Sequence, residues 1–328
     1  MIRRALQSLI AQDHQNWVCE VHNDWPDDAA TIQGIVDSLG DQRFEVFHHR
    51  ENLGGTRSFN LAFESQHEEP FFSILEDDNF WHRNFLSKML ASMGDFPAVA
   101  VAWCNQQVQF EQSDGSFSHS DILVGPTGDA PHLIEFGDVK QALGSIHADG
   151  ATIVRTAMNR ALAVPSDLPF SGIEIFRERA FPFPLLYEPA PLAVFTVTRQ
   201  TGRTDSAYEW FLLLSLAGGS FLKYCDKSLL LDVFAYYRSM VPNSTNPLLA
   251  GLLMNGCLWL ALQNAKFMDW VLLLKAMARR PAFARVFFQG SKFKAWQDFI
   301  DGNTQRRFLG RSTCGRKAGP AGPDAAST

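Results

Sequence analysis

The chain has 328 residues, of which 46% are hydrophobic and 20% charged, and its 29 basic and 35 acidic residues give a formal net charge of −6. This composition excludes a disordered, collagen-like or coiled-coil chain, and the acidic balance indicates no general affinity for nucleic acid. The five cysteines are an odd number without C-x-x-C spacing. They give no sign of a zinc knuckle or a disulfide framework and favour a reducing, cytoplasmic setting.

The first hundred residues alternate between short helical and short strand patterns. The expected helices are Ala5–Ala11, Asp27–Leu39, Thr56–Ser65 and Asn84–Met93, and the expected strands are Trp17–His22, Phe44–His48 and Phe71–Leu75. Strands separated by helices of this length indicate βαβ units. We therefore expect an α/β fold with a mostly parallel sheet flanked by helices.

The middle of the chain is less regular. A strand is expected at Ala98–Trp103, a folded loop region over the Pro- and Phe-rich segment Asp167–Leu192, a helix over Asp205–Ala217 and a strand near Phe221–Cys225. From Pro247 to Ile300 the pattern is helical. We expect a main domain over residues 1–245, a helical extension over 246–305 and a disordered tail over 306–328.

The helical extension contains two apolar stretches, Leu248–Leu262 and Phe267–Leu274, followed by a basic segment. Neither stretch reaches the roughly twenty residues that a membrane span needs. One interpretation is that these helices lie on the inner, anionic face of a membrane. The other is that they pack on the rest of the chain or on a second subunit.

An acidic cluster carries most of the functional information. The buried strand pattern of Phe71–Leu75 runs directly into three carboxylates, Glu76, Asp77 and Asp78. Ligand sites of open α/β sheets lie at the carboxyl ends of strands, and a divalent cation would relieve the repulsion among these anions. A solvated turn that caps a helix is the alternative.

Two segments upstream fit the same kind of site. Asp24 ends the preceding strand pattern, where its carboxylate can accept from a base or a ribose. Asn52, Gly54 and Arg57 belong to a glycine turn that leads into a helix, and a helix N-terminus beside an arginine favours anions. An ordinary tight turn is the alternative for the two glycines.

This order of motifs resembles the family 2 glycosyltransferases of the GT-A fold. The matching segments are Ala5–Asp13, Asn23–Asp24, Asn52–Asn60, Glu76–Asp78, the latter on the D-x-D metal motif, and Phe80–Leu86. The resemblance implies a hexosyltransferase that uses a nucleotide-diphosphate sugar and a saccharide or lipid-linked acceptor in polysaccharide biosynthesis.

By this resemblance, Asp24 would contact the base and Asp77 the ribose, while Asp78, supported by Glu76, would bind Mn²⁺ or Mg²⁺ at the diphosphate. An inverting transfer also needs a carboxylate base near the acceptor hydroxyl. Asp205 is the predicted base with Glu209 one turn behind it, although the family register places the equivalent pair on Ser206-Ala207.

Further departures leave alternatives open. The family's first strand should precede Ala5 but is absent, which indicates either a start upstream of Met1 or loss of part of the donor site. A catalytically inactive GT-A domain that binds a glycan, a nucleotide or a partner is therefore the alternative function. His147 and Asp149 are candidates for an acceptor pocket or for a structural pair. Because the hydrolase elbow, P-loop and dinucleotide fingerprints are missing, those classes lose their main support.

Overall fold

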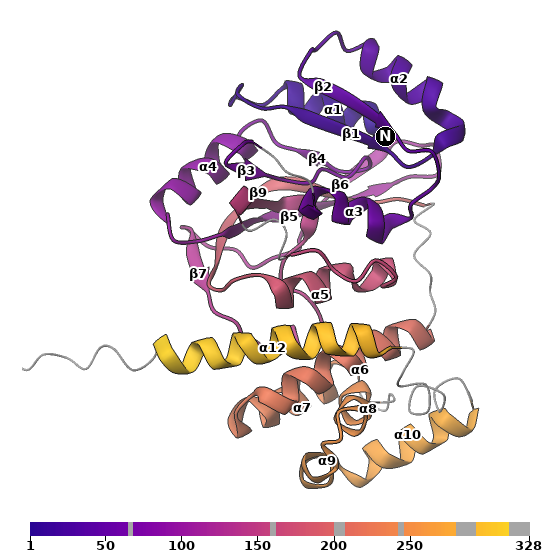
Figure 1. Cartoon of the computed structure of the whole chain (residues 1–328), viewed down its shortest axis with the longest axis vertical. Helices are drawn as coiled ribbons and strands as arrows, with labels where there is room; N and C mark the ends of the chain where they lie inside the picture. Colours follow the sequence, from indigo (N-terminus) through magenta and orange to yellow (C-terminus); the bar gives the residue numbers. More distant parts are fainter. Residues whose placement is uncertain (65–67, 158–161, 200–206, 242–245, 280–292, 315–328) are drawn as a thin grey trace, which may run out of the picture.

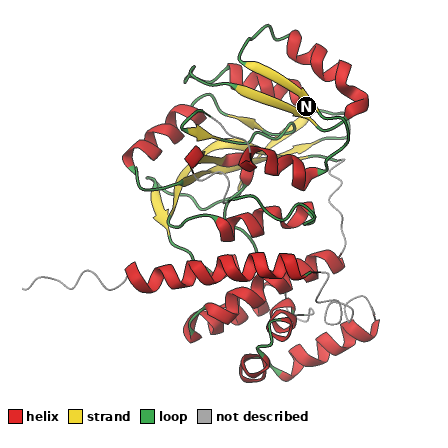
Figure 2. Ribbon diagram, in the orientation of Figure 1, coloured by secondary structure: helices red, strands yellow, loops and turns green. Residues whose placement is uncertain are grey.

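The computed structural model describes residues 1–64, 68–157, 162–199, 207–241, 246–279 and 293–314. Its strands lie in the N-terminal part of the chain, and the helices that follow residue 206 form a separate layer beneath them (Figures 1 and 2). The expected α/β fold, with a central sheet, flanking helices and a helical C-terminal part, is confirmed.

The N-terminal unit is a pair of strands covered by helices. Helix α1 (Ile2–Ile10) is followed by β1 (Cys19–Asn23), α2 (Ala29–Asp37) and β2 (Phe44–His48). Strands β1 and β2 pair in parallel as a two-stranded sheet of their own. A small core that includes Leu6, Val21 and Val36 joins the strands to the two helices, because each element presents one apolar face.

The described residues form a central sheet of seven strands in the order β3-β8-β5-β9-β4, with β6 added on β5 and β7 on β9. The strand bounds are β3 (Phe71–Phe72), β4 (Phe80–Trp81), β5 (Val101–Glu111), β6 (Phe117–Leu123), β7 (His132–Ile134), β8 (Thr152–Arg155) and β9 (Leu185–Val197). Within this sheet β5 and β9 pair in parallel and the other described pairs are antiparallel, so the sheet is mixed rather than mostly parallel.

Helices cover both faces of the central sheet. Helix α4 (Phe85–Asp95) buries Phe85, Met89 and Met93 completely against one face. Helix α3 (Gly55–Glu64) and helix α5 (Ile173–Ala180) lie on the other side, where Phe63 joins a core built on Trp103 and Tyr187. Burial of large apolar side chains on both faces is the main source of stability of such a sheet.

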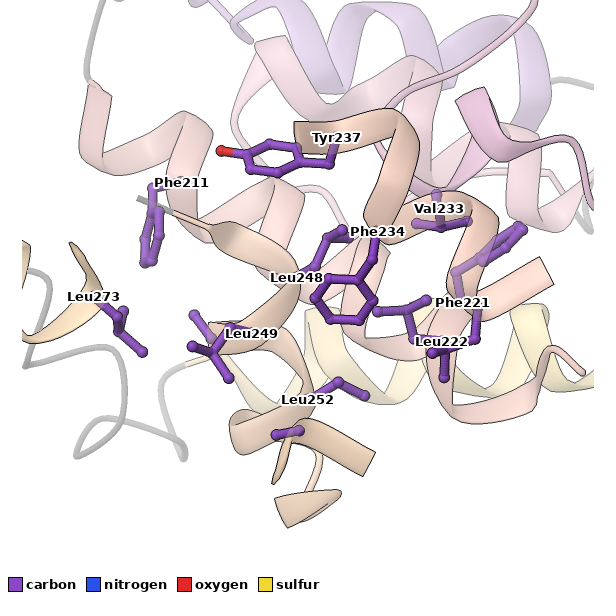
Figure 3. Packing of buried hydrophobic residues seen from close by; sticks show 14 of the residues in the cluster. Phe211, Phe221, Leu222, Val233, Phe234, Tyr237, Leu248, Leu249, Leu252 and Leu273 are labelled. Carbon is purple, nitrogen blue, oxygen red and sulfur yellow. The ribbon is translucent and has the colours of Figure 1, made fainter. Parts of the chain in front are cut away.

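The helical layer consists of α6 (Ala207–Tyr224), α7 (Lys227–Met240), α8 (Pro247–Met254), α9 (Leu258–Asn264), α10 (Phe267–Arg279) and α12 (Lys294–Cys314). Its core is a cluster of Phe and Leu side chains from α6, α7, α8 and α10 (Figure 3). Because α6 begins before residue 246 and packs on α8, the boundary expected at residue 245 falls inside this layer. None of the described helices is long and apolar enough to cross a bilayer.

Four expectations differ from the structure. The segment read as a loop region, 167–192, contains α5 and most of β9, and the strand expected near Phe221–Cys225 is the last turn of α6. The strand expected over Phe71–Leu75 is ordered as β3 over its first two residues. Helix α12 continues to Cys314, into the span expected to be disordered, while residues 315–328 lie outside the described residues.

Candidate active site

The turn between β3 and β4 holds the acidic cluster in a fixed conformation. Asn79 is buried, and its side-chain amide donates to the Glu76 carboxylate while its Oδ1 accepts from the backbone amide of Thr196 in β9, at 2.8 Å. The Trp81 indole donates to the carbonyl of Gly150 at 2.8 Å. The turn is thereby tied to the central sheet on one side and to a short 3₁₀ helix, Asp149–Ala151, on the other.

Glu76 points into the protein. A Cβ atom on Gly150 would lie 2.8 Å from Glu76 Oε2, so glycine at this position makes room for the carboxylate. Burial, followed by the negative charges of Glu174, Asp78 and Asp149, raises the pKa of Glu76 to about 8. Glu76 is therefore mostly protonated at neutral pH, and in this state it is a hydrogen-bonding group rather than an anion.

Asp77 is the exposed carboxylate of the cluster, whereas Glu76 and Asp78 are both half-buried. The main-chain carbonyl of Asp78 accepts from Arg4 Nη2 of α1 at 2.6 Å. The Arg4 guanidinium also packs over the rings of Phe80 and Phe117, 5.0 and 4.1 Å from their centroids. The Arg4 guanidinium thus lies beside the acidic turn, where its positive charge can offset part of the negative charge of the turn.

The carboxylates of this turn are hard oxygen ligands of the kind that Mg²⁺ and Mn²⁺ bind together with substrate phosphates. Within the described ranges, no three His, Cys, Asp or Glu side chains are grouped so that they could hold a metal ion. Asp77 is the carboxylate of the cluster that is most open to solvent.

Asp24 serves a role that the sequence did not indicate. Its Oδ1 accepts from the backbone amide of Leu53 at 2.6 Å and its Oδ2 from that of Gly54 at 2.9 Å, while its carbonyl accepts from Asn52 Nδ2 at 2.9 Å. The turn over residues 52–54 is therefore folded around Asp24. Gly54 has a φ of +78°, a conformation that favours glycine.

The first turn of α3 is packed closely against a loop from far along the chain. A Cβ atom on Gly55 would overlap the ring of Phe170, and Thr56 Oγ1 donates to the carbonyl of Leu168 at 2.7 Å. Arg57 lies on the outside, 51% exposed, with its Nη1 3.6 Å from Glu51 Oε1. Exposed ion pairs of this length contribute little, so Arg57 keeps its charge available to an anionic ligand.

A buried polar path connects α3 to the acidic turn. Asn60 Oδ1 accepts from Arg177 Nη2 at 3.2 Å, and Arg177 pairs through Nη1 with the carboxylate of Asp149. The backbone amide of Asp149 donates to Glu174 Oε1 at 3.1 Å, and its neighbour Gly150 abuts Glu76. Helix α5 thus couples the two predicted parts of a donor site. One part is the Asp24 turn with α3, and the other is the Glu76–Asp78 turn.

The residues of α5 were missed as functional candidates. Arg177, Glu178 and Arg179 are buried and Glu174 is half-buried, although their sequence looks like a solvated charged face. Burial and the nearby charge of Asp149 raise the pKa of Glu174. The spacing of acidic and basic residues three and four positions apart was the available signal, but it does not distinguish a buried network from a surface one.

The structure places His147 at the centre of this network. Its Nδ1 lies 2.9 Å from Glu178 Oε2 and its Nε2 3.3 Å from Asp149 Oδ1. Burial opposes the charged imidazolium, but the hydrogen bonds and charges of these carboxylates raise the pKa of His147 to about 9. The histidine is completely enclosed, so its geometry is that of a structural cation rather than of a side chain lining an acceptor pocket.

Of the two predicted base residues, Asp205 lies outside the described residues. Glu209 is in the first turn of α6, half-buried, and its Oε1 accepts from Ser171 Oγ at 2.6 Å. Ser171 adjoins Phe170, the residue that packs on Gly55. Glu209 is therefore attached to the same loop that contacts the start of α3.

Comparison with known proteins agrees with this architecture. Residues 1–143 match the family model described as glycosyl transferase family 2. The putative colanic acid biosynthesis glycosyl transferase WcaA of Escherichia coli (strain K12) is 29% identical over 105 residues, which are 32% of this chain. The chain spans 37% of the length of that relative.

Solved structures of S. aureus TarS are similar over most of the chain. TarS 1–349 in complex with UDP has a TM-score of 0.52 and 15% identity, and the match covers 96% of this chain and 88% of that one. The complex with UDP-GlcNAc has a TM-score of 0.52 and 14% identity, over 95% and 88% of the two chains. The resemblance is therefore confirmed: the chain is similar to family 2 glycosyltransferases over residues 1–143, and it has the GT-A fold.

Proposed function

We propose that this protein is a glycosyltransferase that moves a sugar from a nucleotide-diphosphate donor to a saccharide or lipid-linked acceptor. The observation that carries the proposal is the coupling of the Asp24 turn to the Glu76–Asp78 turn through Asn60, Arg177 and Asp149. In this proposal, the first turn would receive the nucleoside and the second the diphosphate. The relatives named above support sugar transfer as the reaction class.

The chain's own residues have distinct roles in this proposal. Asp77 would contact the ribose, and Arg57 with the amides at the start of α3 would attract the anionic donor. Asp24 would fix the turn over residues 52–54 by accepting its amides, and its remaining lone pairs would face the base. Glu76, mostly protonated at neutral pH, would hold the acidic turn to Asn79.

A divalent cation, Mn²⁺ or Mg²⁺, fits the hard oxygen ligands of the acidic turn. Asp78 would hold it, and the exposed carboxylate of Asp77 lies next to it in the same turn. The metal would supply Lewis-acid stabilisation of the departing diphosphate. Glu76 was predicted to support the metal site, and its inward orientation favours an indirect role through the conformation of the turn.

We further propose that transfer inverts the anomeric centre, with Asp205 as the base that takes the acceptor proton and Glu209 behind it. Glu209 is positioned by Ser171 at 2.6 Å, next to the loop that contacts α3. Loss of turnover in Asp205→Asn with unchanged donor binding would support this assignment. Equal turnover in that variant would contradict it, and the anomeric configuration of the product, read by NMR, tests inversion.

The first experiment is calorimetric titration with UDP, GDP and dTDP, each with and without Mn²⁺, on the wild type and on Asp78→Ala. UDP comes first because TarS was solved with UDP and UDP-GlcNAc. The matched control is Asp95→Ala, which removes an exposed carboxylate at the end of α4. Metal-dependent binding that Asp78→Ala abolishes and Asp95→Ala retains supports the proposal, and failure of every nucleotide to bind a folded sample contradicts it.

A binding protein without turnover is the second candidate. The observation that favours it is that both carboxylate oxygens of Asp24 are already engaged by the turn. Metal-dependent nucleotide binding without hydrolysis or transfer of any donor sugar would select this alternative over the enzyme.

A further inference from the structure

Helices α9 and α10 lie at the end of the molecule opposite β1 and β2 (Figure 1), and several of their large apolar side chains are exposed to solvent. Trp259 is 70% exposed and Phe267 80%. The other members of this α9–α10 apolar face, each more than half exposed, are Leu258, Leu262, Met268 and Leu274. Six exposed large apolar side chains within residues 258–274 are typical of an interaction site.

The apolar face is not a consequence of poor packing. On α10, Phe267, Leu274 and Ala278 are exposed at positions i, i+7 and i+11, and therefore lie on one side of the helix. The opposite side contributes Leu273, which is 2% exposed, to the core of the helical layer. Helix α9 likewise buries Ala261 while exposing Trp259 and Leu262. Each helix thus has one apolar side that packs in the core and a second apolar side that is exposed to solvent.

The exposed charges within the described segment that carries this face, residues 258–279, have one sign. Between Leu258 and Arg279 the basic residues Lys266, Lys275 and Arg279 are exposed. The one acidic residue of that segment, Asp269, is buried and pairs with Arg238 at 2.8 Å. Asp301 of α12, which lies near the start of α9, pairs with Lys223 at 2.7 Å. The rim of the apolar face is therefore cationic.

We propose that the α9–α10 apolar face binds the surface of an anionic lipid bilayer, with Trp259 and Phe267 inserted at the level of the headgroups. An apolar face with a cationic rim matches both parts of such a surface, the acyl boundary and the negative headgroups. A symmetric dimer through this face would instead bring the three cations of each copy against those of the other. The inference is independent of the sugar-transfer reaction.

The test uses the full-length protein and vesicles of phosphatidylglycerol and phosphatidylcholine in equal parts, with pure phosphatidylcholine vesicles as the comparison, in a sedimentation assay. We expect binding to the anionic vesicles that weakens as salt is added. The double variant Trp259→Ser/Phe267→Ser should weaken it at least about tenfold. The matched control, Ile122→Ser, removes a 54% exposed apolar side chain from β6 and should bind as the wild type does.

A second variant tests the proposal even if the first double variant does not fold. Lys266→Glu/Lys275→Glu changes two exposed charges without touching the core, and it should reduce binding by about tenfold while circular dichroism stays unchanged. The proposal is overturned if wild type does not sediment with anionic vesicles, or if both double variants bind as the wild type does. It is also overturned if the face instead mediates a dimer in light scattering that Trp259→Ser/Phe267→Ser dissociates.

Discussion

The crossing of α6 and α8 depends on two glycines, and replacing one of them should separate the helices. A Cβ atom on Gly251 would lie 2.7 Å from the backbone nitrogen of Gly219 and 2.8 Å from its Cα, whereas ordinary contacts of a Cβ are 3.4–4 Å. The carbonyl oxygen of Ser215 would lie closer still, so Gly251→Ala requires the helices to move apart by more than about 0.6 Å. Because the contacting atoms are backbone, no side chain can rotate to relieve the overlap.

The magnitude follows from two opposing effects. Overpacking a core costs about 1–3 kcal/mol, and the close backbone contact places this site at the upper end. Alanine is favoured over glycine in a helix by about 1 kcal/mol, which offsets part of that cost. The expected net loss is about 2 kcal/mol, which corresponds to a fall in melting temperature of about 3 °C for a chain of this size.

Differential scanning calorimetry of Gly251→Ala should be compared with that of Gly302→Ala. Gly302 lies in the middle of α12, and a Cβ there would meet nothing within 4 Å. Gly302→Ala should therefore keep the full helix-propensity gain and melt at or above the wild type. If Gly251→Ala melts as high as Gly302→Ala, the proposed backbone contact between α6 and α8 does not limit the stability of the layer.

Three further predictions concern the candidate site. Asp24→Ala leaves the amides of Leu53 and Gly54 without their acceptor and should lower the free energy of unfolding, measured in urea, by about 1–3 kcal/mol. Asp24→Asn should lower it less, and equal losses in the two variants would contradict this role of Asp24. The pKa of Glu76 rises from 4.5 to about 8 on folding, so its protonation stabilises the fold at low pH. This contribution is lost progressively as the pH rises from about 4.5 to about 8, and Glu76→Gln should not show this loss in melting curves. Glu178→Gln removes a carboxylate that faces His147 and should cost about 3–5 kcal/mol and lower the pKa of His147, which NMR titration measures.

The sequence predicted the N-terminal elements well because their signals are local. Helix α1 buries Ala5, Leu6 and Leu9, which are spaced along one face, and α4 does the same with its Phe and Met residues. The order of these elements also carried the family resemblance. Local apolar periodicity is sufficient to predict an element when that element packs one face on a neighbour that is close to it in the chain.

The segment around β9 shows where local patterns fail. Pro189 and Pro191 lie within this strand and argue against one on sequence grounds. The structure accommodates them at register shifts between β5 and β9, where Cys104 pairs with Glu188 and the next residue, Asn105, with Pro191. The irregular pairing depends on a partner strand about eighty residues away, which periodicity alone does not show.

The candidate site was predicted in its parts but not in its connections. The acidic turn and the Asp24 turn were identified, whereas the buried network on α5 was not, because its partners Asn60 and Asp149 come from distant segments. Charged residues at helical spacing are usually solvated, and burial of Arg177 becomes understandable once both partners are seen. Asp24 was expected to face a ligand, and its bonds to the turn explain why a carboxylate is needed there before any ligand binds.

The separate β1–β2 sheet leads to a last prediction, on local stability. Within the described residues β1 pairs with β2 alone, and the buried core that holds the pair to α1 and α2 is small. Ala102 and Ala193, by contrast, lie on strands of the central sheet and are completely or almost completely buried. Regions with few buried apolar contacts open locally before the whole chain unfolds. Backbone amides of Val21 and Val46 should therefore exchange with deuterium about 100-fold faster than those of Ala102 and Ala193. Equal protection of all four would show that the two sheets unfold as one cooperative unit, and the Asp24 turn at the end of β1 would then be as rigid as the acidic turn it is coupled to.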